Sequence, residues 1–277
     1  FEVVNKFIDN KNIQKFICNI EKNIKLIGIT NTGKVFNIDW ESNINKDYKL
    51  DNKILGNIHP SEIINFHSIK KEIKNYLCIL NSDGRFKKVL FDEDMIKSNR
   101  SFAITKLKNN IKIIDSFIIS NAEKNLIILT SIGRIFKFDL SNKFLTPTTK
   151  QSQGFMLTKL LPSEKIVSCC PYTNGENIYL VSRLGKIFCI NSNEIYYANE
   201  YSLGYLNERT QLKNDSFLKI LKSNLYLDIE TNKNKSARLD FDKLNFKSNK
   251  TNFLVDFLEL DKGEYLENCF QLEKCFD

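Results

Sequence analysis

Short apolar runs separated by tight turns recur along the chain. In Leu26–Ile38 (LIGITNTGKVFNI) an apolar run ends in the small polar Thr30, a turn follows at Gly33, and a second run alternates apolar and polar residues. The same pattern returns in Leu77–Val89, Leu126–Phe138, Ile178–Ile190 and Leu227–Leu239. Their turn residues are Gly33, Gly84, Gly133, Gly185 and Asn234, separated by steps of 51, 49, 52 and 49 residues. A repeat of this length indicates one structural unit per repeat.

Each repeat is typical of two antiparallel strands joined by a tight turn. Glycine at the turn supplies a left-handed backbone conformation, and asparagine is the residue that best replaces it there. We therefore include the repeat around Asn234, although it lacks the glycine. Five positions after the turn residue the side chain is always apolar: Ile38, Val89, Phe138, Ile190 and Leu239.

A second motif, a polar turn followed by an apolar strand, lies between the hairpins. The clearest copies are Pro60–Phe66 and Pro162–Ser168. Looser copies are Asn110–Ile114, Asp215–Lys219, Gly263–Glu267 and, at the start of the chain, Asn12–Ile17. Regular strands without a helical stripe predict an all-β fold: a propeller-like disc of five to six four-stranded blades, formed as a single domain by residues 1–277. Half-units at the two ends of the chain would pair to close the ring.

The charge of the chain is strongly uneven. The 277 residues carry a net charge of +8, yet residues 251–277 hold seven acidic and two basic residues. A solvated surface explains this pattern, and so does a body that binds a polyanion and carries an acidic tail that competes for it. No apolar run approaches the ~20 residues of a membrane-spanning helix, so we expect no membrane association.

Basic residues occupy the same position in every repeat. The residue after the turn is Lys34, Arg85, Arg134, Lys186 or Lys235, and three residues later stand Asn37, Lys88, Lys137, Cys189 and Arg238. Charged residues also protect exposed strand edges, but glutamate would serve that purpose as well and never occurs in the first row. The pattern favours a positive rim that binds duplex DNA through its backbone and shape. The predicted contacts are Lys34, Arg85, Lys88, Arg134, Lys137, Arg183, Lys186, Lys235 and Arg238.

Motifs for catalysis or cofactor binding are missing from the sequence. There is no phosphate-binding glycine loop, the acidic residues do not recur in register, and His59 and His67 are better explained as structural. The seven cysteines lack metal-site spacing and are expected to be reduced thiols. Trp40 and the phenylalanines are expected in the core, with base stacking as the alternative. We expect no enzyme activity, cofactor, metal or small-molecule substrate.

The repeat resembles the C-terminal β-pinwheel domain of the A subunits of DNA gyrase and topoisomerase IV. The resemblance is best in Thr130–Tyr172, where Gly154, Leu160 and Glu164 stand at the glycine, leucine and acidic positions of the family pattern. It implies a non-catalytic domain that wraps DNA for strand passage and supercoiling. It also implies two protein partners, the cleavage domain of the same polypeptide and the separate ATPase subunit. The location that it implies is the cytoplasm, in association with the nucleoid, or else an organelle stroma. The acidic segment Asp256–Asp277 resembles the regulatory tail of that family.

The chain departs from the family in three respects. A box with Gln, Arg and several Gly residues is missing, since Lys150–Gly154 holds one glycine and no arginine. A complete first blade is missing or reduced to residues 1–20, and no cleavage domain is present, so we expect a fragment whose wrapping of DNA is incomplete. The alternative function is a scaffold propeller that binds proteins and no nucleic acid, but a scaffold has no reason to keep one charge in every blade.

Overall fold

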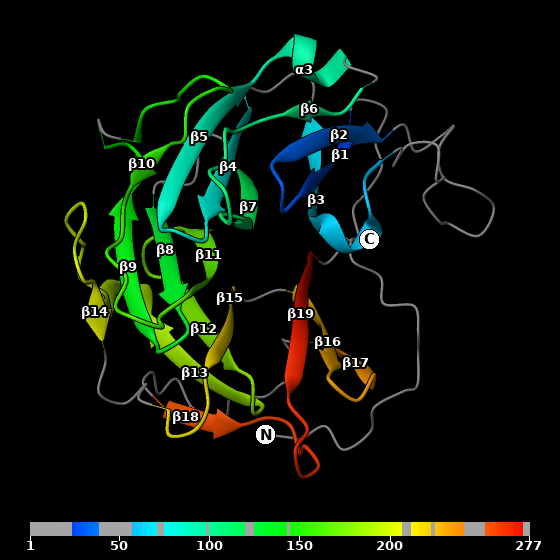
Figure 1. The fold of residues 1–277 in the computed structure, drawn as a ribbon. Helices are drawn as coiled ribbons and strands as arrows, with labels where there is room; N and C mark the ends of the chain where they lie inside the picture. Colours follow the sequence, from blue (N-terminus) through cyan, green and yellow to red (C-terminus); the bar gives the residue numbers. More distant parts are fainter. Residues whose placement is uncertain are drawn as a thin grey trace. The chain divides into compact units, whose positions relative to one another are not determined.

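The computed structural model describes residues 24–38, 57–70, 75–97, 100–119, 125–142, 145–206, 212–222, 225–240 and 253–273. Strands dominate this part of the chain, with the short helix α3 (Glu93–Lys97) and the 3-10 turns η1 (Pro60–Glu62) and η3 (Ser192–Glu194) between them (Figure 1). None of the helices in these residues is long and apolar enough to cross a membrane.

All five predicted hairpins are present. They are formed by β1 (Ile24–Thr30) and β2 (Lys34–Ile38), β4 (Asn75–Asn81) and β5 (Arg85–Phe91), β8 (Asn125–Thr130) and β9 (Arg134–Asp139), β12 (Asn177–Ser182) and β13 (Lys186–Asn191), and β16 (Leu225–Thr231) and β17 (Ser236–Asp240). In every turn the residue at the glycine position donates its N–H to the carbonyl of the small polar residue three positions earlier. Its φ is positive, between 75° and 90° for the four glycines and 58° for Asn234, which confirms the interpretation of the fifth repeat.

The second motif forms the third strand of each sheet. These strands are β3 (Ile63–Lys70), β7 (Ile113–Ile119), β11 (Ile166–Tyr172), β15 (Phe217–Leu221) and β19 (Leu266–Glu273). Each pairs antiparallel with the first strand of its hairpin, with a register shift at the turn end. The expected strand at Asn12–Ile17 lies outside the described residues.

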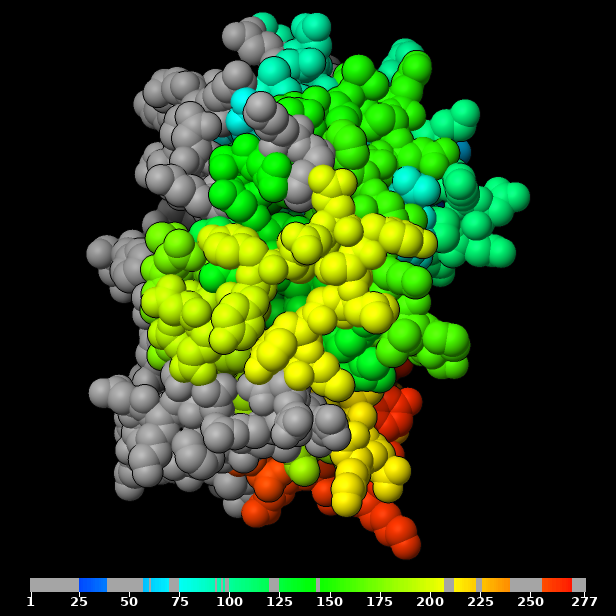
Figure 2. Space-filling view, turned by 90° about the vertical axis from the view of Figure 1, so that its left-hand side faces the viewer, coloured from blue at the N-terminus to red at the C-terminus, as the bar shows by residue number. Residues whose placement is uncertain are grey.

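The fourth strand of each sheet comes from a distant part of the chain. These strands are β6 (Phe102–Ala103), β10 (Phe155–Met156), β14 (Tyr205–Leu206) and β18 (Phe253–Asp256), and each belongs to the segment that follows the next hairpin. We call residues 97–112, 141–163, 192–206 and 251–264 the crossing segments of sheets 1 to 4. The third of them contributes to the yellow surface in Figure 2. The sheet orders are β3-β1-β2-β6, β10-β5-β4-β7, β11-β8-β9-β14 and β15-β12-β13-β18, and the fifth sheet, β17-β16-β19, has three strands in the described residues.

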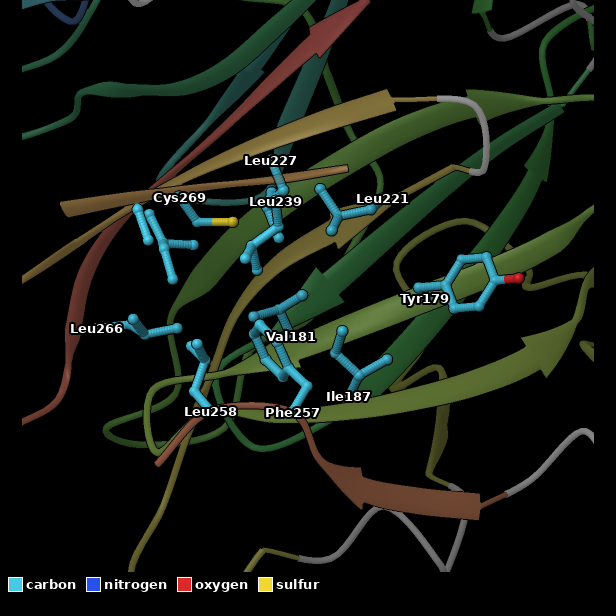
Figure 3. Close-up of a cluster of buried hydrophobic side chains, with 12 residues drawn as sticks. Tyr179, Val181, Ile187, Leu221, Leu227, Leu239, Phe257, Leu258, Leu266 and Cys269 are labelled. Atoms are coloured by element: carbon cyan, nitrogen blue, oxygen red, sulfur yellow. The ribbon is translucent and has the colours of Figure 1, made fainter. Parts of the chain in front are cut away.

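The chain forms two compact units, one comprising Ile20–Lys124 with Leu140–Lys159, and the other Asn125–Asp139 with Leu160–Asp277. The first unit holds sheets 1 and 2, which share a core that includes Ile27, Ile29 and Leu77. The second holds sheets 3 to 5 and two cores. One of these packs sheet 4 against sheet 5 through Val181, Leu227 and the residues around them (Figure 3). The single domain predicted for residues 1–277 stays a prediction.

The predicted all-β class with four-stranded blades is confirmed, and the acidic end of the chain contributes two of its strands. Asp256 ends β18, and β19 pairs with β16 along its whole length. Leu266 of β19 lies fully buried in the core of Figure 3. The described part of this segment is therefore built into sheets 4 and 5, which agrees with the strand expected at Gly263–Glu267. That its acids compete for a polyanion stays a prediction. Cys78, Cys169, Cys170, Cys189 and Cys269 carry thiols that are not in a disulfide, and Cys18 and Cys275 lie outside the described residues.

Candidate nucleic-acid interface

The first basic row begins the second strand of each hairpin, but its five members differ in what surrounds them. Lys34 is exposed at the start of β2, and Lys186 is half-buried at the start of β13. Neither side chain has a charged partner in the described residues. Arg85, at the start of β5, forms an ion pair with Asp83 on its own turn, with 3.1 Å between Nε and Oδ2. Asp83 is partly exposed too, so a phosphate can compete for the guanidinium.

Arg134 lies inside its sheet rather than on its surface. Its residue is 4% exposed, and its guanidinium forms a two-pronged ion pair with the buried Glu164. It also donates a hydrogen bond to the carbonyl of Leu203. Burial works to raise the pKa of Glu164, but hydrogen bonds from Arg134, the Leu161 N–H and Thr130 outweigh it and hold this pKa below its ordinary value. These contacts argue against the prediction that Arg134 touches DNA and make the residue structural.

Lys235 repeats this arrangement in the fifth sheet. Its Nζ lies 2.8 Å from Asp261 Oδ2 and 3.1 Å from Glu264 Oε2. Thr231 donates to Glu264, as Thr130 does to Glu164. The hydrogen bonds that Lys235 donates to these two acids raise its pKa above its ordinary value. The first row is therefore not a uniform row of free positive charge, because acids about thirty residues further along the chain neutralise two of its members.

The remaining predicted contacts are partly engaged. Lys137 is buried, donates to the carbonyl of Ser192 at 3.0 Å, and burial lowers its pKa, so its side chain does not reach a surface ligand. Arg238 is exposed but forms a two-pronged pair with the buried Asp228, at 2.6 and 2.7 Å. Arg183 donates to the carbonyl of Leu266 at 3.2 Å. Lys88 stays half-exposed, its Nζ 4.7 Å from the centre of the Tyr76 ring.

Basic residues that the repeat did not predict lie on the crossing segment of sheet 1. Residues 97–112 contain five basic and no acidic residues. Lys106, Lys108 and Lys112 are all exposed. Ile104, just after β6, donates its N–H to the carbonyl of Gly33, so this segment runs beside the start of β2, where Lys34 is exposed. Counting charges in each segment after a hairpin would have found these lysines.

A buried lysine joins this segment to the next one. Lys87 of β5 is fully buried, and its Nζ donates three hydrogen bonds of 2.8 Å, to the carbonyls of Ile104, Lys150 and Ser152. Burial lowers the pKa of Lys87 to about 8. Lys150, whose residue is exposed, holds its Nζ 5.1 Å from the centre of the Phe102 ring in β6. The crossing segments of sheets 1 and 2 are thus held to each other at residues 102–104 and 150–152, and both carry exposed lysines.

Comparisons with known proteins agree with this architecture. No family model matches the chain. The A subunit of DNA topoisomerase 4 from Synechocystis sp. is 26% identical over an alignment of 117 positions that covers 39% of this chain and only 13% of that protein. The C-terminal domain of DNA gyrase A superposes with a TM-score of 0.68 at 17% identity, over 91% of this chain and 84% of that one.

The C-terminal domain of DNA topoisomerase IV superposes equally well, with a TM-score of 0.68 at 18% identity, over 91% of this chain and 80% of that one. At such identities the likeness concerns the fold. The resemblance found in the repeat is confirmed at that level: this chain has the fold of the C-terminal domains of DNA gyrase A and topoisomerase IV.

Proposed function

We propose that this chain binds duplex DNA without sequence preference and bends it, as the C-terminal domain of the A subunit of a type II topoisomerase. The observation that carries the proposal is the group of exposed, acid-free lysines on sheets 1 and 2: Lys34, Lys106, Lys108, Lys112 and Lys150. The fold of gyrase A and topoisomerase IV C-terminal domains supports it.

Phosphates are the ligand that this surface fits. Lysine binds phosphate as a point charge and releases condensed counterions, which gives affinity without reading the bases. Four of these five lysines belong to two neighbouring crossing segments whose positions Lys87 holds. A repeated cluster of Asn, Gln or Arg that would read base edges is missing from the sequence.

Further parts of the proposal follow from the fold. The chain itself carries no catalytic group in this proposal. It presents DNA to two partners, the cleavage domain of its own polypeptide and the separate ATPase subunit, in association with the nucleoid. Arg85 and Lys88 extend this contact surface, and Lys186 on sheet 4 is a further contact, whereas Arg134, Lys137 and Lys235 support the sheets.

The salt dependence of DNA binding tests this assignment. In a Lys106→Gln/Lys108→Gln variant, the slope of log affinity against log salt should fall by about two, equally on duplexes of unrelated sequence. The matched control is Lys213→Gln/Lys262→Gln, which removes two exposed lysines elsewhere and should leave the slope unchanged. Equal slopes for wild type and the first variant would reject this contact surface. Absence of any duplex binding would favour the protein-binding scaffold.

A further inference from the structure

The crossing segment of sheet 3, residues 192–206, has a surface unlike that of sheets 1 and 2. Tyr196 is 76% exposed, Tyr201 59% and Tyr197 54%, and Leu203 is 48% exposed beside them. Figure 2 shows this yellow segment lying openly on the face in view. Contiguous exposed aromatic and apolar side chains of this kind are typical of protein interaction sites.

The rings of this tyrosine segment are held in place. Tyr197 donates from its hydroxyl to Asn125 Oδ1 at 2.7 Å, and its ring centre lies 4.4 Å from Lys137 Nζ. Tyr196 and Tyr205 pack edge to face with 6.2 Å between ring centres. Ala198 donates its N–H to the carbonyl of Lys137 at 2.8 Å. A preorganised aromatic surface loses little conformational entropy when it binds a partner.

The charge of the tyrosine segment points to the class of partner. It contains two acidic residues, Glu194 and Glu200, and no basic residue. Lys137, the cation beneath it, is buried. A phosphate would meet two carboxylates and no basic side chain of this segment, whereas lysine and arginine side chains would meet both carboxylates and the faces of tyrosine rings.

The backbone of the segment favours an extended partner. The strand β14 is the last strand in the order β11-β8-β9-β14, so its outer edge has no strand beside it in the described residues. An extended peptide can pair with such an edge while its side chains contact the neighbouring surface.

We propose that the tyrosine segment is a docking surface for an extended protein segment rich in lysine or arginine. This surface consists of residues other than the lysines of sheets 1 and 2, and the proposal does not depend on DNA binding. The domain would therefore hold a basic protein segment on sheet 3.

The test uses the whole 277-residue chain and a fluorescent probe peptide of about twelve alternating lysine and valine residues, long enough for an edge strand. Tyr196→Ser and Glu200→Lys should each weaken binding of this peptide by about tenfold, the loss typical of a central contact residue. The control Glu259→Lys makes the same charge reversal at another exposed acid and should change binding less than about twofold.

Hydrogen exchange of residues 192–206 should slow when the peptide is bound. Equal losses of peptide affinity in Glu200→Lys and Glu259→Lys would mean that the peptide is bound by general charge attraction, and this would overturn the proposal. Protection of the same residues by single-stranded oligothymidine rather than by the peptide would assign the tyrosines to base stacking and overturn it as well. Tyr196→Ser should leave duplex DNA affinity unchanged, and a loss there would place the segment in the DNA site.

Discussion

The backbone conformation and the space available both restrict which residue can stand at a hairpin turn. A positive φ favours glycine. In three sheets the crossing segment also packs so closely against the turn that a Cβ would be crowded there. A Cβ on Gly84 would stand 2.2 Å from Thr158 Oγ1, and one on Gly185 would stand 2.8 Å from the Leu258 Cβ. At Asn234 only the positive φ restricts the residue, since no crossing segment reaches its sheet in the described residues. This difference explains why asparagine is tolerated in the fifth repeat.

Substitutions at two turns should therefore have opposite outcomes. Gly185→Ala should lower the free energy of unfolding by about 3 kcal/mol, from left-handed strain together with displacement of Leu258. Asn234→Gly should keep it within about 1 kcal/mol of the wild type or raise it. Urea unfolding followed by circular dichroism measures both, and equal losses would show that crowding by the crossing segment is unimportant.

The ion pair between Arg134 and Glu164 joins a residue of the first basic row to a distant part of the chain. Its position in the repeat made Arg134 a candidate for DNA contact, but its partner lies 30 residues away and is brought in by β11. The family pattern marked Glu164 as an acidic position, yet pairing between the two depends on strand order. Sequence spacing alone does not report that order.

Arg134→Met should lower the free energy of unfolding by about 3–5 kcal/mol, because it leaves a buried carboxylate unpaired. The pKa of Glu164 is depressed in the fold, so the pair stabilises fully above the ordinary carboxyl pKa of 4.5 and loses its contribution as the pH falls through the folded value. The difference between wild type and variant should therefore shrink in acid. A difference that stays constant from pH 7 to about pH 3 would contradict this origin.

At the scale of elements, the hairpins and third strands were predictable and the crossing strands were not. The hairpins carry alternation, a turn residue and a repeat, all visible in one sequence. In contrast, β6, β10 and β14 are two residues long, too short to show any periodicity. The lysines of residues 97–112 flank one of these short strands, β6, whose position the periodicity does not show.

Lys87 joins the crossing segments of sheets 1 and 2, and these segments carry the lysines of the proposed DNA site. Lys87→Met keeps an apolar stem of similar length but removes three hydrogen bonds, leaving the carbonyls of Ile104, Lys150 and Ser152 without this donor. The variant should unfold at lower urea, and its amides at 104–106 and 150–153 should exchange faster.

Duplex affinity of the Lys87→Met variant should fall while its salt slope stays near that of the wild type, since Lys87 itself does not touch phosphate. Lys88→Met is the matched control, and it should change the slope by about one with little effect on stability. A slope change in Lys87→Met as large as that in Lys88→Met would mean that the ammonium reaches DNA.

At the scale of the whole molecule, the crossing segments differ in the sign of their net charge. Those of sheets 1 and 2 are basic and free of acids, that of sheet 3 is acidic and aromatic, and that of sheet 4 carries four acids and one base. A DNA path that follows the lysines is therefore short. Bending a duplex costs several kcal/mol, and a short path supplies few contacts to offset it.

We expect this chain to cause only a small change in linking number. Nicked circular DNA ligated in its presence should show a small positive shift, below that of a gyrase domain with the glycine-rich box at the same salt. A shift as large as that of the gyrase domain would mean that neither the box nor a continuous basic path is required. Tight binding without any shift would favour a domain that grips DNA without bending it.

The exchange of strands between consecutive sheets bears on how such a chain changes length in evolution. Ile104, Leu157 and Phe257 each donate an N–H to the carbonyl of the turn glycine in the preceding repeat, Gly33, Gly84 and Gly185 respectively. Each of these repeats therefore offers the same acceptor and receives the same donor. A duplication or loss of one whole repeat, wherever its breakpoints fall within the period, joins a donor to an equivalent acceptor and leaves no strand unpaired. Recombination within a gene for this fold can thus add or remove a blade in one event. The strands that join neighbouring blades also make one blade able to replace another.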